Sequence, residues 1–492
     1  MKKTWFNERQ TNIIILSLLG LGIFAGIAEM PLRGEEPRRS LLALEMLLSG
    51  DFLQPTIHGW LYYNKPPLFN WIISGLFRVF GYPYDWLVRV PSLVGFVVMG
   101  WIHYKVTRVY LGEIVARWSA LFLMTSVHFL FFATVISGEM DLFYSLIVYL
   151  QAIAIFHFLE KGQVLKMMLV SYALMAIGLL TKGTPSLAFQ AITLIAWLPL
   201  RGHWRLLFSW QHLLGIGMAC FILATYLIPY HFSGGNISLL GFNLLEEASR
   251  KSLTTSPLWE LPLHVILFPL KVLALFLPWS LLIAYWFRKD WNSVIREHPF
   301  ILFAVLFVCT NLAPYWLSPD SRDRYLYAFG PFITLLLAYG YTRFSKIPGR
   351  WVVVFILILS SARIGYNLVV IPIQKKHIYN INLFDRMAKE ALSLAGAEPL
   401  HALGETDTLA IDISIGSYVF RDTILEPTWL PYQIPFYIAR ERQKIMVSDT
   451  VMQPGIYYLA TRSEVDTTIC TIYARYSTEN GDDNWILCKM KE

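Results

Sequence analysis

The sequence predicts a polytopic α-helical membrane protein with a folded domain outside the membrane, and three observations support this fold class. Of 492 residues, 55% are apolar and only 15% charged, whereas soluble chains carry about 25% charged residues. The apolar residues form long blocks, such as 13–27, 142–158 and 352–370, which approach the ~20 residues that span a bilayer. The chain after residue 375 is more polar. An ordinary soluble, fibrous or disordered protein is therefore excluded.

About eleven apolar segments are expected to cross the membrane as helices, because a helix satisfies its own backbone hydrogen bonds in lipid. No cleavage-site pattern follows the first of them, which we interpret as a retained helix rather than a signal peptide. The expected spans are 12–30, 90–106, 116–135, 142–159, 167–181, 184–200, 207–230, 262–287, 298–317, 325–342 and 351–373.

Lysine and arginine fall in every second connection between these segments. They precede the first span and follow the second, fourth, sixth, eighth and tenth spans. Basic connections face the cytoplasm, so the opposite loops and the chain after the last span are expected outside. We interpret the net charge of +7 as this topology signal, and expect membrane lipids but no nucleic acid as partners.

Two domains are expected. Residues 1–375 form the transmembrane domain, with a long first outer loop at 31–89 and a second at 231–261. In the second loop, 239–253 is apolar on one side and charged on the other, which is typical of a helix lying on the membrane surface. Residues 376–492 are expected to form a soluble α/β or α+β domain, with a helix at Leu383–Leu394 and strands at Thr408–Ile413 and Gly455–Ala460. Its Cys470 and Cys488 can pair if the compartment is oxidising.

Ionisable residues adjoin several spans on the outer side. Burying such groups is costly, so they tend to pair or to serve a site. By the topology above they share one face of the membrane, and we expect them to converge on one cavity. They are Glu35, Glu36, Arg38 and Arg39 after the first span, Asp141 at the start of the fourth, Lys182 between the fifth and sixth, Arg250 in the surface helix, and Arg322, Asp323, Arg324 and Tyr325 at the tenth.

This mixture of cations and carboxylates favours chemistry on a lipid-linked phosphate. Lysine and arginine neutralise a phosphate without a metal, and a nearby carboxylate suits a general base that takes a proton from an acceptor hydroxyl. Nucleotide-activated sugars are scarce outside the cytoplasm. A transferase there needs a membrane-bound donor, and a polyprenyl-phosphate sugar fits.

Each charge also has a structural interpretation. Lys65, before two prolines, can mark the membrane interface, and Lys182 can cap two helices. Arg38 and Arg39 can pair with Glu35 and Glu36, and Arg250 with Glu246. Arg322 and Arg324 can bind lipid headgroups, and Glu139 reads as a solvated loop residue. No histidine shows metal-ligand spacing, so we expect no cofactor; a divalent cation on Glu35, Glu36 and Asp141 is the disfavoured alternative.

Short motifs in a fixed order resemble the GT-C glycosyltransferases. The nearest resemblance is to the lipid A aminoarabinose transferases, with the protein O-mannosyltransferases as more distant relatives. It covers roughly the first 345 residues. The motifs are Glu35-Glu36-Pro37-Arg38, Glu45-Met46-Leu47-Leu48-Ser49-Gly50-Asp51, Lys65-Pro66, Thr181-Lys182-Gly183, Pro278-Trp279 and Arg324-Tyr325.

The resemblance implies a GT-C-like fold and assigns roles to particular residues. Glu35 matches the proposed acceptor-activating acid; because this chain has Glu-Glu where the family has Asp-Glu, Glu36 is a rival. Asp141 matches an acid at the start of the fourth span. Substrate-binding positions, mainly for the donor phosphate and sugar, are Arg38, Tyr62, Lys65, Lys182, Arg250, Arg324 and Tyr325. The family glutamate before the lysine is Asn64 here, and a histidine near Arg250 is absent, so the resemblance transfers no metal site.

The sequence thus predicts an inverting glycosyltransferase of the bacterial inner membrane, with its active site and C-terminal domain facing the periplasm. It would move a sugar, as in lipopolysaccharide modification by an aminoarabinose transferase, from a polyprenyl-phosphate donor to lipid A, another glycan or a protein. One alternative is an oligosaccharide or O-antigen ligase with a diphosphate-linked donor. Another is a lipid or solute transporter, which should show inverted-repeat hydropathy and charges deep within spans; we find neither in the sequence.

Overall fold

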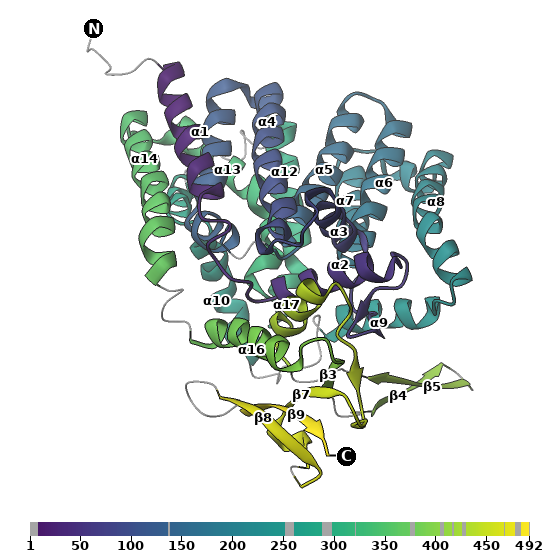
Figure 1. Ribbon diagram of the computed structural model, residues 1–492. Helices are drawn as coiled ribbons and strands as arrows, with labels where there is room; N and C mark the ends of the chain where they lie inside the picture. The colour runs from purple at the N-terminus through teal and green to yellow at the C-terminus, as the bar shows by residue number, and fades with distance from the viewer. Residues whose placement is uncertain are drawn as a thin grey trace. The chain divides into compact units, whose positions relative to one another are not determined.

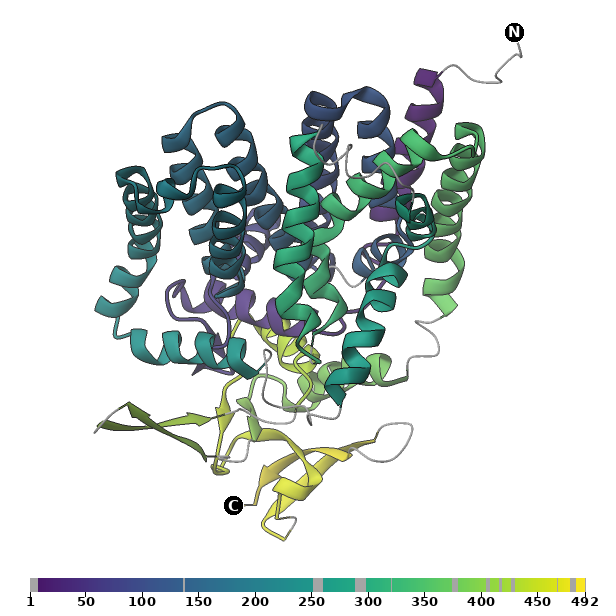
Figure 2. The same ribbon diagram turned by 180° about the vertical axis from the view of Figure 1, so that it is seen from behind.

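A computed structural model describes residues 8–135, 138–250, 260–287, 298–319, 321–373, 379–403, 408–415, 418–425, 430–466, 468–477 and 484–491 (Figures 1 and 2). The chain divides into two compact units. Unit 1 contains residues 1–28, 63–69 and 89–370, and unit 2 contains residues 29–62, 70–88 and 371–492.

Unit 1 is helical. Figures 1 and 2 show its long helices side by side, with α5 packed on α6, α6 on α8, and α4 on α13. Its α-helices are α1 (Glu8–Phe24), α4 (Val90–Thr125), α5 (Asp141–Glu160), α6 (Val164–Lys182), α7 (Pro185–Leu200), α8 (Trp210–Phe232), α9 (Ile237–Arg250), α10 (Glu260–Leu275), α12 (Pro299–Trp316), α13 (Gly330–Phe344) and α14 (Gly349–Gly365).

Five helical segments of the described chain are long and apolar enough to cross a membrane: Asp141–Glu160, Val164–Lys182, Trp210–Phe232, Pro299–Trp316 and Gly349–Ile373. They confirm apolar helices of membrane-spanning length at the expected spans 142–159, 167–181, 207–230, 298–317 and 351–373, as in an integral membrane protein. Apolar helices at Gln10–Phe24, Pro185–Leu200 and Leu261–Leu275 are shorter. The count of eleven spans stays a prediction.

The second and third expected spans correspond to the two helices that make up α4, which meet at a kink at Gly112. This glycine has φ +83° and ψ 172°, a conformation that costs glycine little because it has no Cβ. The third expected span, 116–135, is correct in its first half only: α4 ends at Thr125, and a separate π-helical turn follows at Phe129–Ala133.

Stacked aromatic rings and buried polar bonds hold unit 1 together. The rings of Phe122 and Trp279 stack with centroids 4.2 Å apart. Between helices, the Gln151 Nε2 atom donates to Gln190 Oε1 at 2.8 Å. Because lipid tails are as apolar as the side chains, such close packing and interhelical bonds, rather than hydrophobic burial, drive helix association in membranes.

Unit 2 combines segments from the two ends of the sequence. From the first outer loop come α2 (Glu36–Ser49), the hairpin of β1 (Thr56–Ile57) and β2 (Trp60–Leu61), most of α3 (Leu68–Phe80) and the 3₁₀ helix η1 (Asp85–Val88). From the tail come α16 (Tyr379–Ala395), α17 (Gln433–Arg442) and the remaining strands. The expected helix at Leu383–Leu394 is confirmed by α16.

The tail contains a mixed sheet in the order β6-β3-β7-β9-β8, in which β3 runs parallel to β6 and β7, and β9 antiparallel to β7 and β8. These are β3 (Leu400–Leu403), β6 (Ser448–Asp449), β7 (Tyr457–Thr461), β8 (Cys470–Ser477) and β9 (Asn484–Met490). A separate hairpin pairs β4 (Thr408–Ile415) with β5 (Tyr418–Leu425). Both expected strands are confirmed. Cys470 and Cys488 are buried, unbridged thiols on β8 and β9.

Within unit 2, a buried acid fixes the hairpin of the first loop. The carboxylate of Glu45, on α2, is inaccessible to solvent. It accepts hydrogen bonds from Thr56 Oγ1 at 2.7 Å, from the His58 amide at 2.7 Å and from the Gly59 amide at 3.1 Å. Burial raises the pKa of Glu45 to about 7, although these bonds oppose the shift.

We expect Glu45 to make stability depend on pH. The raised pKa means that the folded chain holds this proton more tightly than the unfolded chain. The free energy of unfolding from this group should therefore fall as pH rises from about 4.5 to about 7 and then level off. Glu45→Gln should remove that component, which thermal unfolding of the detergent-solubilised protein between pH 5 and 8 would measure. The control is Glu398→Gln, at a half-exposed carboxylate; an unchanged pH slope in Glu45→Gln would contradict the assignment.

Candidate functional site

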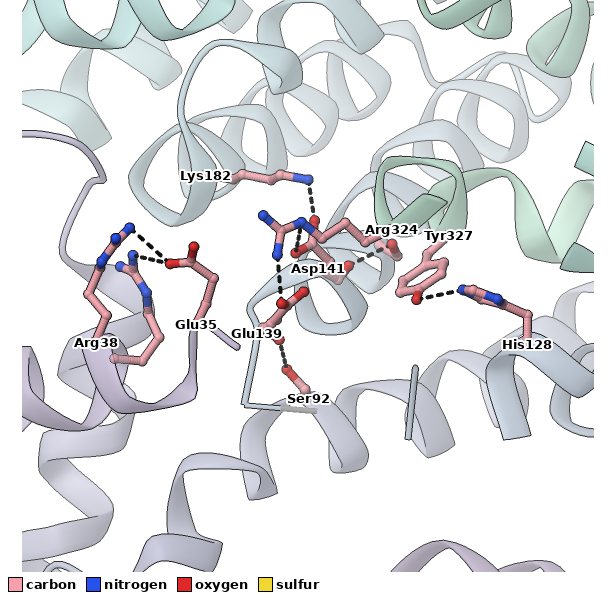
Figure 3. Close-up of polar contacts among 11 residues, drawn as sticks. Glu35, Arg38, Ser92, His128, Glu139, Asp141, Lys182, Arg324 and Tyr327 are labelled. Atoms are coloured by element: carbon pink, nitrogen blue, oxygen red, sulfur yellow. Dashed lines mark hydrogen bonds and ion pairs between the residues drawn. The ribbon is translucent and has the colours of Figure 1, made fainter. Parts of the chain in front are cut away.

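The α5 charge cluster, which we define as Glu139, Asp141, Lys182 and Arg324, lies in unit 1 (Figure 3). Lys182 Nζ contacts Asp141 Oδ1 at 2.5 Å. Arg324 Nη1 contacts Glu139 Oε1 at 2.6 Å, and its Nε lies 3.7 Å from Asp141 Oδ2. Ser92 Oγ donates to the Glu139 carbonyl at 2.6 Å. Two cations and two carboxylates from separate segments thus form one network.

Helix ends explain why these residues meet. Asp141 is the first residue of α5 and Lys182 the last residue of α6. A carboxylate is favoured at a helix N-terminus and a cation at a C-terminus. Since α5 and α6 are consecutive, packed helices joined by a short turn, the start of one and the end of the other lie at the same end of the pair. Gly183, with φ +95°, then ends α6.

Aromatic rings surround the lysine of this cluster. Lys182 Nζ lies 4.5 Å from the centroid of the Tyr325 ring and 4.9 Å from that of Tyr144. Ser186 Oγ donates to the Tyr144 hydroxyl at 3.0 Å. Ring faces attract cations, so these rings fix the ammonium group. Lys182 and Tyr325, two of the predicted donor-phosphate residues, are therefore neighbours.

The α5 charge cluster is mostly withdrawn from water. The Asp141 side chain is 6% exposed, Lys182 11%, and Glu139 and Arg324 each 19%. Charges in such a setting are costly unless paired, which explains the network. Within the described residues, Arg324 Nε is buried and makes no hydrogen bond. It lies 3.7 Å from Asp141 Oδ2, an ion-pair contact that is too long for a hydrogen bond.

The α2 cluster, which we define as Glu35, Arg38, Arg39 and Tyr62, lies in unit 2. Arg38 Nη1 contacts Glu35 Oε2 at 3.0 Å, and Arg39 Nη2 lies 3.7 Å from the same oxygen (Figure 3). Arg39 Nη2 also donates to the Tyr62 hydroxyl at 2.9 Å. The predicted local pairing of both arginines with Glu35 is present, and Tyr62 joins it.

The two adjacent glutamates have different surroundings. Glu36 is fully buried at the start of α2, where its Oε2 accepts a hydrogen bond from the Arg33 amide at 3.2 Å. The side chain of Glu35, in the N-cap position, is 30% exposed. Only Glu35 of this pair presents a carboxylate that an acceptor can approach.

For two other predicted residues, Lys65 and Arg250, the structure gives the position in the fold. Lys65 is half-buried in the segment before α3, next to buried Pro66 and Pro67. Arg250 is the last residue of α9, so the predicted helix in the second outer loop is confirmed. The side chain of Arg250, and Glu246 as its alternative partner, lie outside the described residues. The predicted roles of Lys65 and Arg250 stay predictions.

Some interpretations of the charges were wrong. Glu139 is not a solvated loop residue but the ion-pair partner of Arg324. Charges also occur within expected spans: Lys271 of α10 pairs with Asp323 at 2.8 Å, and Arg363 of α14 is only 2% exposed and donates to Asn367. The sequence could have indicated that Lys271 and Arg363 are paired, since an ionisable residue inside an apolar segment needs a partner.

Comparisons with known proteins support the resemblance. A family model described as dolichyl-phosphate-mannose-protein mannosyltransferase matches residues 64–228. No curated protein matches the chain. Two solved structures of ArnT from Cupriavidus metallidurans are similar, one in the apo state and one bound to undecaprenyl phosphate. Each is 15% identical and covers 98% of both chains, with TM-scores of 0.68 and 0.67 respectively. The chain therefore shares the fold of these ArnT structures, which is the predicted GT-C fold, and its residues 64–228 are similar to the mannosyltransferase family model.

Proposed function

We propose that the chain is an inverting glycosyltransferase that moves a sugar from a polyprenyl-phosphate donor to an acceptor outside the cytoplasm. The observation that carries this proposal is the α5 charge cluster, in which Lys182 adjoins Tyr325 and Arg324 has a buried N–H group that donates no hydrogen bond to any described residue. The comparisons add support: the matching family model is named for a lipid-phosphate sugar, and one ArnT structure contains undecaprenyl phosphate.

In this proposal the donor phosphate binds to Lys182, Tyr325 and Arg324, together with Lys65 and Arg250. Asp141 holds Lys182 in place through their ion pair. As the bond between the anomeric carbon and the phosphate oxygen breaks, its electron pair leaves with the phosphate. Fixed cations stabilise that charge without reorganisation, which is usually the largest contribution to catalysis.

Glu35 is the proposed general base. It takes the proton of an acceptor hydroxyl or phosphate, whose oxygen bonds to the anomeric carbon on the face opposite the leaving phosphate, so the configuration inverts. Arg38 and Arg39 hold the Glu35 carboxylate, and Tyr62 holds Arg39.

The proposed location, donor sugar, acceptor and absence of a cofactor rest on the sequence. We place the protein in the bacterial inner membrane with its catalytic residues toward the periplasm, propose an aminoarabinose-type donor and lipid A as the first acceptor to test, and assign no metal or other cofactor to the reaction.

The test uses the full-length protein purified into lipid nanodiscs. It is incubated with lipid A and a panel of undecaprenyl-phosphate sugars, comprising aminoarabinose and several hexoses, and with an undecaprenyl diphosphate-linked oligosaccharide. Release of undecaprenyl phosphate, or of undecaprenyl diphosphate from the diphosphate-linked donor, is measured with and without EDTA. We expect release from at least one monophosphate donor, dependent on acceptor and resistant to EDTA, and a product with inverted anomeric configuration. Turnover of the diphosphate donor alone would identify a ligase, and no turnover of any donor would refute the proposal.

A further inference from the structure

Helix α17, from the tail, packs against α2, from the first outer loop, within unit 2. At the start of α17, Gln433 Nε2 donates to the Leu32 carbonyl at 3.3 Å. Further along, Arg440 Nη1 pairs with Asp85 Oδ1 at 2.9 Å. Contacts at both ends of the helix therefore fix α17 on the loop that carries Glu35.

Tyr432, the N-cap residue of α17, contacts the α2 cluster directly. The guanidinium carbon of Arg38 lies 5.0 Å from the centroid of the Tyr432 ring. Arg39 is held in the same manner by Tyr62, whose ring centroid lies 5.6 Å from its guanidinium carbon. Two tyrosine–arginine pairs thus border Glu35, one from the loop and one contributed by the tail.

We infer that Tyr432 is a positioning residue for the Glu35–Arg38 pair, so that the C-terminal segment contributes to transfer without contacting the donor. This inference rests on the proposed function, because it assigns the role through the base Glu35.

The physical reason is the weakness of a half-exposed ion pair. The side chains of Glu35 and Arg38 are each 30% exposed, and pairs in contact with water gain little energy because they must immobilise two flexible side chains. The Tyr432 ring packed on the Arg38 guanidinium removes part of that freedom before the pair forms. A catalytic group must be held to within about 0.5 Å of its working geometry. Tyr432 supplies a restraint that the ion pair alone lacks.

The experiment measures kcat and the donor KM of full-length variants, with the undecaprenyl-phosphate sugar that the wild-type chain turns over. Tyr432→Ala should lower kcat about tenfold, a modest loss for a displaced reacting group, and leave the donor KM within about twofold. Tyr432→Phe keeps the ring and should lower kcat less than Tyr432→Ala does. The matched control is Tyr437→Phe on the same helix: its hydroxyl contacts Asp85 at 3.3 Å, outside the α2 cluster, so kcat should not change.

A double-mutant cycle separates positioning from general destabilisation. If Tyr432 acts through Arg38, then Tyr432→Ala should cost little more once Arg38→Ala is present. An equal loss in both backgrounds, or wild-type kcat in both Tyr432 variants, would overturn the inference while the proposed function stands. If Tyr432→Ala does not fold, Tyr432→Leu, which removes the aromatic ring but keeps a large apolar side chain, decides by the same comparison with Tyr437→Phe. A wild-type chain that releases no undecaprenyl phosphate from any donor would refute the proposed function and the inference with it.

Discussion

Glu35→Gln is expected to reduce sugar transfer about 100- to 10,000-fold, the contribution typical of a general base. The amide has nearly the shape of the carboxylate and can still accept a hydrogen bond from Arg38, so the α2 cluster should keep its form. It cannot take a proton from the acceptor. Initial rates of undecaprenyl phosphate release measure the loss, and thermal unfolding checks that the variant is folded.

The neighbouring glutamate gives the matched comparison. Glu36 is buried and bonded to the Arg33 amide, so Glu36→Gln should lower the unfolding temperature while retaining most of the transfer rate. If Glu36→Gln instead abolishes transfer and Glu35→Gln does not, the base is Glu36.

Asp141→Asn is expected to destabilise the protein by about 3 kcal/mol, because removing one partner of a buried ion pair leaves the other charge uncompensated. Lys182 would lose its contact at 2.5 Å. Chemical or thermal unfolding of the detergent-solubilised protein measures this change. Transfer should fall as well, because Lys182 is no longer held at the donor phosphate.

The double variant Asp141→Asn with Lys182→Met distinguishes these two effects. Replacing both members of a buried ion pair by groups without charge is often nearly neutral for stability, so the unfolding temperature should recover toward wild type. Transfer should not recover, because the cation is gone. A double variant as unstable as Asp141→Asn alone would show that Asp141 matters through some other contact.

The hydropathy of the sequence predicted the long membrane helices well, because a 20-residue apolar block has few alternatives. It also predicted that Lys182 and Asp141 would meet, since both follow from helix ends on one side of the membrane. It also placed two separate spans, 90–106 and 116–135, in the region of α4, and the kink at Gly112 lies between them. It did not predict the end of α4 at Thr125, because the apolar sequence continues to residue 135 and hydropathy alone does not register where a helix ends.

The partners of the charged residues were harder to predict. Glu139 appeared solvated because it lies in a short polar segment, and its burial depends on Arg324, distant in sequence. Lys271 could have been noticed, since it interrupts an apolar segment. The contact between Arg38 and Tyr432 had no sequence signal. The two residues belong to segments of unit 2 that lie about 400 residues apart in the sequence, on either side of the segments that form unit 1. No residue pattern in one segment indicates that it packs against the other.

The assembly of unit 2 from both ends of the chain has a consequence for biosynthesis. A ribosome delivers residues 29–88 well before α17. Until α17 has been made, α2 lacks the helix that packs against it, and Arg38 lacks the Tyr432 ring. A nascent chain that stops before α17 would therefore leave that surface of α2 exposed, so the final form of the first outer loop waits for a segment translated several hundred residues later.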